Sequence, residues 1–117
     1  GTEVPARFLR AAVELLRPGG VAVVMALDVQ CVDGRRPLRE LCAGIDAAGH
    51  VTARIPTRLN ALLPDLEASM CERQPNLRAA VHVAVVITPD DDSKFRARFA
   101  SVTRRLAQRW NTDVNPR

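Results

Sequence analysis

The longest apolar run in the chain, residues 77–88, constrains the fold more than any other stretch. A strand over this run would carry two apolar faces, with Val81, Val83, Val85 and Ile87 on one and Ala80, His82, Ala84 and Val86 on the other. A strand of this kind is normally covered on both faces or lies centrally in a sheet. We therefore expect a central strand with His82 as the one ionisable group in its middle.

Helical and extended patterns alternate along the rest of the chain. Apolar spacing predicts helices over 4–16, 37–48, 57–70 and 93–110, and strands over 21–29 and 50–55. Thr57 is placed to cap the third helix, and Pro64 either kinks that helix or starts a new one. Gly49 is a natural stop for the second helix. The chain from Asn111 onward is expected to fray.

This order of elements predicts the fold class. Helices that alternate with strands favour an α/β sandwich of two or three layers around a mixed sheet of three or four strands. A length of 117 residues suits one domain with a core of its own. Gly1 and Thr2 fit a cloning remnant, in which case the domain comes from a longer protein.

Several apolar stripes are expected to be buried. The strand over 21–29 reads as a buried strand, whereas the strand over 50–55 alternates and is expected nearer an edge. The helical stripes predicted to face the core are Phe8, Leu9, Ala12, Val13, Leu15 and Leu16 in the first helix, Leu38, Leu41, Cys42 and Ile45 in the second, Leu59, Leu62, Leu63, Leu66 and Met70 in the third, and Phe95, Phe99, Val102 and Leu106 in the last.

Composition excludes some classes of protein. The net charge is +4, but Lys94 is the only lysine among many arginines, which is typical of a GC-rich genome rather than a nucleic-acid signal. Cys31, Cys42 and Cys71 are too widely spaced for a zinc motif and too few for a disulfide framework. No apolar run has the length of a membrane span, and no signal-peptide pattern occurs. We therefore expect a cytoplasmic protein that does not enter membranes.

A few ionisable residues are candidates for chemistry. Asp28 lies near the end of the first strand, where a carboxylate can hold a metal, although a turn-facing or capping role is the simpler interpretation. Asp33 and the triplet at 90–92 have oxygens for a hard cation, but the triplet is more simply a helix cap. His82 is more simply a hydrogen-bonded core residue than a general base, and His50 has no evident partner.

The last helix is basic. A face of this kind can follow a phosphate backbone, and the cations are Lys94, Arg96, Arg98, Arg104, Arg105 and Arg109. It lacks interleaved aromatic residues and any recognised reading motif. A solvated or dimer-facing arginine surface is the favoured interpretation, with nucleic-acid binding as the alternative.

Four segments, taken in order, resemble the class III nucleotidyl cyclase homology domain in its divergent actinobacterial form. The resemblance covers residues 21–108, and its segments are 26–29 (Ala-Leu-Asp-Val), 45–49 (Ile-Asp-Ala-Ala-Gly), 55–59 (Ile-Pro-Thr-Arg-Leu) and 77–82 (Leu-Arg-Ala-Ala-Val-His). In that family two Asp residues bind two metal ions, and the resemblance places Asp28 at the first of these positions. The second belongs to a Gly-Asp hairpin that is missing here, because Gly49 runs almost directly into Ile55.

The resemblance also implies a late helix with catalytic residues. The family carries an Asn and, four positions on, an Arg that stabilises the transition state; Arg105 matches the Arg, but Ser101 stands at the Asn position. Two-metal chemistry needs both sides of the cation clamp. The resemblance therefore implies a degenerate relative that keeps dimerisation and has lost turnover, with Asp28 and Arg105 as the only candidate site residues.

A second resemblance covers the first third of the chain. Residues 8–24 (Phe-Leu-Arg-Ala-Ala-Val-Glu-Leu-Leu-Arg-Pro-Gly-Gly-Val-Ala-Val-Val) are similar to the helix, turn and strand in the second half of a Rossmann-like methyltransferase. The loop that holds S-adenosylmethionine lies upstream in that family, and the chain is too short for the complete fold. This alternative implies a fragment or a decayed copy.

Taken together, these patterns favour a non-catalytic, cyclase-like α/β domain without a cofactor. We expect it to act in regulation, by self-association as a homodimer or by contact with a partner domain. The strand directions distinguish the two resemblances, because an antiparallel central pair favours the cyclase-like plan and parallel neighbours favour the Rossmann-like one.

Overall fold

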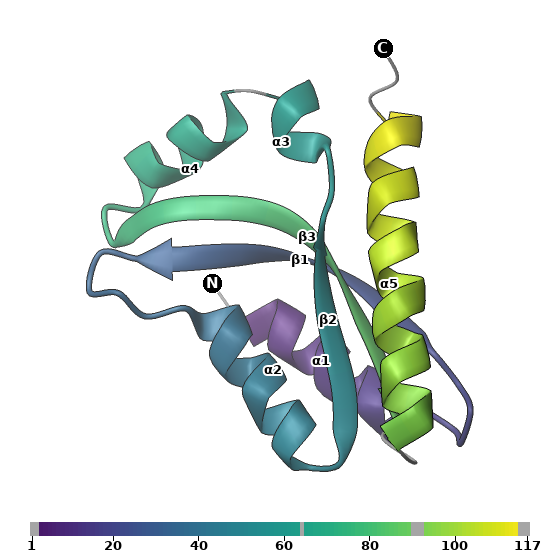
Figure 1. Ribbon diagram of the computed structural model, residues 1–117. Coiled ribbons are helices and arrows are strands. Elements are labelled where there is room, and N and C mark those ends of the chain that lie inside the picture. The colour runs from purple at the N-terminus through teal and green to yellow at the C-terminus, as the bar shows by residue number, and fades with distance from the viewer. Residues whose placement is uncertain (1–2, 64, 90–92, 115–117) are drawn as a thin grey trace.

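The computed structural model describes residues 3–63, 65–89 and 93–114, and within them it confirms the α/β class (Figure 1). The elements follow in the order α1 (Glu3–Leu15), β1 (Ala22–Cys31), α2 (Pro37–Ala47), β2 (His50–Pro56), α3 (Leu59–Leu62), α4 (Leu66–Arg73), β3 (Leu77–Pro89) and α5 (Ser93–Val114). Figure 1 shows α1 and α2 on one side of the sheet and α5 against β2 on the other.

The three strands form one sheet in the order β1-β3-β2. Both pairings are antiparallel, so β1 and β2 run parallel to each other on either side of β3. With α2 as the crossover from β1 to β2, this is a split β-α-β unit. The sequence predicts β3 as the central strand, which is confirmed. It also predicts a mixed sheet, and this detail is wrong: β3 inserts between the two parallel strands, so no parallel pair is hydrogen-bonded.

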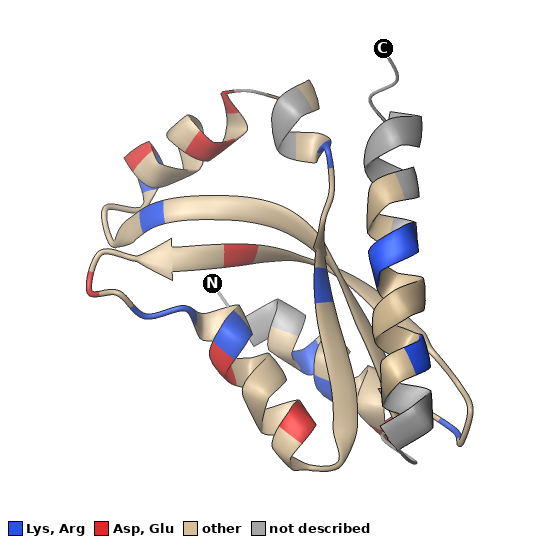
Figure 2. Cartoon of the chain, viewed as in Figure 1, with Lys and Arg blue, Asp and Glu red and all other residues tan. Residues whose placement is uncertain are grey.

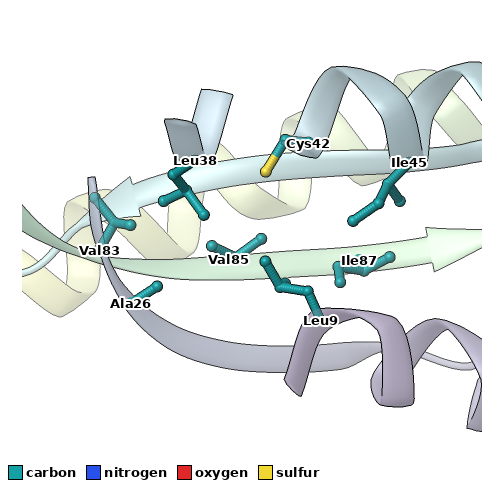
Figure 3. Packing of buried hydrophobic residues seen from close by; sticks show 8 residues of the cluster. All are labelled: Leu9, Ala26, Leu38, Cys42, Ile45, Val83, Val85 and Ile87. Atoms are coloured by element: carbon teal, nitrogen blue, oxygen red, sulfur yellow. The ribbon is translucent and has the colours of Figure 1, made fainter. Parts of the chain in front are cut away.

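One hydrophobic core lies between the sheet and the helices α1 and α2. Figure 3 shows side chains of α1 and α2 pointing toward those of β3, with one residue of β1 beside them. The eight residues are Leu9 of α1, Leu38, Cys42 and Ile45 of α2, Ala26 of β1, and Val83, Val85 and Ile87 of β3. Leu9, Cys42, Val85 and Ile87 are completely inaccessible to solvent. The predicted stripe of α2 is therefore confirmed at Leu38, Cys42 and Ile45, with Leu41 partly buried.

A second, smaller core lies on the opposite face of the sheet. Ile55, Ala84 and Val86 pack there against Phe99 of α5. The predicted stripe of α5 is only partly correct, because Val102 is 45% exposed and Thr103 is buried in its place. The residues at positions 99, 103 and 107 face the sheet. The apolar pattern of the sequence does not identify this four-residue spacing, because Thr103 is polar. The side chains of Phe95 and Leu106 lie outside the described residues, and α5 continues to Val114 rather than fraying from Asn111.

Two short helices connect β2 to β3. The predicted third helix is divided into α3 and α4 around residue 64, which itself lies outside the described residues. Leu62 and Leu63 are about half exposed rather than buried, because α3 is a single turn and does not cover the sheet. The longer α4 packs on β3 beyond the end of β2, and Glu67 accepts a hydrogen bond from the backbone N–H of Ala80 there.

Candidate functional site

Asp28, the candidate metal ligand, lies on β1 opposite Val81 of β3. Its Oδ2 is 4.0 Å from Nε of Arg54, and both side chains are about three-quarters buried. Within the described part of the chain, no group of three His, Cys, Asp or Glu residues is arranged to hold a metal ion. The nearest described charge partner of Asp28 is thus a cation rather than a second carboxylate.

Arg105, the other candidate from the cyclase resemblance, lies on α5 and is exposed, as is Ser101. Asp28 is paired with Val81, and both lie on the same face of the sheet as Val83 and Val85. This face is packed against α1 and α2, whereas α5 packs on the opposite face. The sheet therefore separates Asp28 from Arg105, and one copy of the chain does not bring them into one site.

The two histidines occupy the sheet. His82 is partly buried, and its Nδ1 lies 2.6 Å from Oγ1 of Thr57 at the start of α3. The backbone N–H of Thr57 also donates to the carbonyl of His82 at 2.9 Å. This places His82 in a contact that joins β3 to the end of β2. His50 begins β2 opposite Pro89, and its Nδ1 is buried without a hydrogen-bond partner among the described residues.

The remaining acidic candidates are structural where they are described. Asp33 accepts a hydrogen bond from the backbone N–H of Arg35 in the turn after β1, and Gly34 in that turn has φ of +91°. The acidic triplet at 90–92 lies outside the described residues. Nothing in the described turn brings a second carboxylate to Asp33.

The three cysteines are free thiols in different surroundings. Cys42 is fully buried, and burial raises the pKa of its thiol, although Arg54 and Thr52 act in the opposite direction. Cys31 and Cys71 are partly exposed. No disulfide joins these three residues in the structure.

The basic helix presents its described arginines to solvent. Arg98, Arg104 and Arg105 are all exposed on α5. The side chains of Lys94, Arg96 and Arg109 lie outside the described residues. Among the described helices, none combines the length and the apolar character needed to cross a membrane.

The two edges of the sheet differ in how they are protected. On the β2 edge, the carboxylate of Asp46 accepts hydrogen bonds from both the N–H and the hydroxyl of Thr52, each at 2.9 Å. The N–H of Thr52 therefore points away from β3, toward the free side of β2. Because it is already bound to Asp46 of α2, this donor is not available to a further strand. Helix α5 also covers one face of β2. This edge is therefore partly protected against pairing with a further strand.

The β1 edge is open and apolar. The sequence predicts β1 as a buried strand, and this is wrong for one of its faces: Val23 is 57% exposed and Met25 46%, and Val21 just before the strand is 59% exposed. Alternation shows which residues share a face but not whether an element covers it. Asp28 is the only charged residue in β1, and Figure 2 shows β1 and β3 as largely uncharged ribbons. No described side chain hydrogen-bonds the backbone of residues 22–30.

A cavity of about 570 Å³ adjoins the same strand. Its walls include the consecutive residues Met25, Ala26 and Leu27 together with Leu38 of α2 and Met70 of α4. The cavity thus lies against β1 where α2 and α4 approach it. The surface next to β1 is therefore hollowed as well as apolar.

Helix α1 extends the apolar surface on the other face of the sheet. Phe8 is 62% exposed and Leu15 80%, so the predicted stripe of α1 is wrong at these two positions. Leu9 instead occupies the core, and Ala12, Val13 and Leu16 pack beside it. Phe8 and Leu15 are seven positions apart, which places them on one side of the helix. In the sequence, this exposure is indicated by the width of the apolar stripe of α1, which is greater than one neighbouring layer can cover.

Comparison of the chain with protein-family models, with curated proteins and with solved structures finds no match.

Proposed function

We propose that this chain is a non-catalytic, cyclase-like α/β domain that self-associates through the free edge of β1. The observation that carries the proposal is the contrast between the two sheet edges. One edge strand is partly protected by Asp46 and α5, whereas the other leaves Val23 and Met25 exposed, and no described side chain binds its backbone. Proteins usually blunt such an edge with charge, proline or a covering element, and an unprotected one pairs with another strand.

Two terms favour pairing at this edge. Each backbone hydrogen bond formed between strands contributes about 1 kcal/mol net, and fully burying a Val or Met side chain contributes roughly 1.5–3 kcal/mol. Val23 and Met25, each about half exposed, supply part of that amount in every copy. These gains oppose the loss of translational and rotational freedom on association.

The cyclase-like part of the proposal is supported by strand direction and by site chemistry. An antiparallel partner for β1 suits the cyclase-like plan better than the parallel neighbours of the Rossmann-like one. After α2 the chain enters β2 at once, and the neighbour of β2 in the described sheet is β3, so no hairpin for a second metal carboxylate lies between Gly49 and Ile55. A degenerate relative that keeps association without turnover is consistent with both features.

The test is the molar mass of the chain in solution with a matched pair of variants. We expect the wild-type chain to be a dimer at micromolar concentration by light scattering and sedimentation equilibrium. The double variant Val23→Lys/Met25→Lys is expected to be a folded monomer, because dimerisation would bring four ammonium groups to one strand pair. Val102→Lys, on the exposed side of α5, is the control and remains a dimer. A wild-type monomer at all concentrations would refute the proposal.

A further inference from the structure

We infer that two copies pair β1 with β1 in antiparallel fashion around a two-fold axis at Met25, and that α1 of each copy packs against α1 of the other. The inference rests on the proposed self-association and adds the partner surface and its register. In a two-fold contact the same surface serves both copies. Two identical edge strands satisfy this requirement only when they run antiparallel.

The side chains of β1 suit pairing with a copy of themselves. Opposite residues of an antiparallel pair point to the same face. The axis must therefore lie between the two copies of one residue, which is then paired with itself. With the axis at Met25, Val23 of one copy lies opposite Leu27 of the other, and Met25 lies opposite Met25. The uncovered face of the joint sheet then carries only apolar pairs, and Val24 lies opposite Ala26 on the other face.

The position of Asp28 and the length of the pairing select this register. An axis at Ala26 or Leu27 would place Asp28 opposite Val24 or Ala26, well inside the pairing. An axis at Val24 would pair only residues 22–26 of each strand. The axis at Met25 pairs residues 22–28 and leaves Asp28 at the end of the ladder, opposite Ala22, where water still reaches its carboxylate.

Helix α1 has the position that this register requires. It packs chiefly on β1, in a core that includes Ala22, Val24 and Ala26. Because β1 is the edge strand, a two-fold axis at Met25 brings the two α1 helices next to each other on the same face of the joint sheet. Phe8 and Leu15, which α2 does not cover, then have an apolar partner.

The contact reaches the size of a specific interface. The seven residues of β1 that this register pairs span about 23 Å, and the 13 residues of α1 span about 20 Å. A strip of sheet edge and a helix pair of these lengths bury on the order of 600 Å² per copy, which clears the roughly 1,000 Å² total expected of a biological interface. The strand pair alone would fall short of this value.

Disulfide cross-linking reads the register directly. In a background with Cys31→Ser and Cys71→Ser, and with the buried Cys42 kept, Met25→Cys is expected to form a covalent dimer under mild oxidation. Opposite residues in an antiparallel pair have Cα atoms about 4.5–5.5 Å apart, within the range that a disulfide bridges. Val23→Cys alone is not expected to cross-link, but a mixture of Val23→Cys and Leu27→Cys forms the mixed dimer. Val102→Cys is the control.

The helix contact has its own pair of variants. Leu15→Glu is expected to weaken dimerisation roughly tenfold or more, whereas Leu62→Glu, at another exposed leucine that lies on α3, leaves it unchanged. A dimer in which Met25→Cys fails to cross-link, or in which Val24→Cys or Ala26→Cys cross-links instead, overturns this geometry and leaves self-association standing. A chain that stays monomeric overturns both.

Discussion

The hydroxyl of Thr57 and Nδ1 of His82 lie 2.6 Å apart and share a hydrogen bond where β2 ends beside β3. The same hydroxyl accepts from the backbone N–H of Leu59 at 3.4 Å, at the start of α3. One side chain therefore links the central strand, the end of the edge strand and the first turn of the connection between them. This arrangement gives His82 a structural role, as the sequence favours.

Removal of that hydroxyl is expected to destabilise the fold. Thr57→Val keeps the shape of the side chain but loses the hydrogen bond in a partly buried site, at a cost of about 1–2 kcal/mol in the free energy of unfolding. Thr57→Ser keeps the hydroxyl and is expected to retain most of the stability. Urea denaturation followed by circular dichroism measures both variants. Equal losses for the two would show that the methyl group, rather than the hydroxyl, is responsible.

Two glycines, one inside α2 and one just after it, are expected to respond to alanine in opposite ways. Gly49 turns the chain from α2 into β2 with φ of +97°, and an L-residue there costs about 1–2 kcal/mol. Gly44 lies inside α2, and a Cβ added to it meets nothing within 4 Å. Gly44→Ala is therefore expected to stabilise the fold by roughly 0.5–1 kcal/mol. Thermal unfolding of the two variants gives the signs, and a stabilising Gly49→Ala would contradict this account.

The central strand was predictable from residues 77–88 because a run that is apolar on both faces has few other places in a fold. The turn at Gly49 and the first residue of α2 at Pro37 were predictable for a similar reason, since each follows from local backbone chemistry. The uncovered face of β1 was not. Val23 and Met25 have the spacing of buried residues, and only the strand order reveals that no helix lies over them. Asp28 and Arg105 fall on opposite faces for the same non-local reason.

The buried thiol is expected to make stability depend on pH. Burial raises the pKa of Cys42, so the folded chain keeps the proton on this thiol at a pH where the unfolded chain loses it. The resulting stabilisation is complete below the unfolded value of about 8.5 and is lost as pH rises through the folded value. The free energy of unfolding should therefore fall more steeply above pH 8.5 in the wild type than in Cys42→Ala. Cys71→Ser is the matched control and should keep the wild-type slope.

Incubation with nucleotides tests the absence of turnover. The chain with ATP or GTP and Mg²⁺ or Mn²⁺ is expected to form no cyclic nucleotide, because Asp28 faces Arg54 and has no described second carboxylate with which to hold two metal ions. An active cyclase run in parallel establishes the sensitivity of the assay. Product that forms with the wild type and disappears with Asp28→Ala would assign a catalytic role to this carboxylate.

The most direct measurement of the central claim is amide hydrogen exchange across β1 as a function of protein concentration. A strand paired at its free edge has its outward N–H groups in hydrogen bonds, so these amides exchange slowly only when the second copy is present. We predict that protection of β1 rises with concentration and disappears in Val23→Lys/Met25→Lys, while the protection of β3 stays the same in both. Protection of β1 that is independent of concentration and unchanged in the double variant would contradict self-association through this edge.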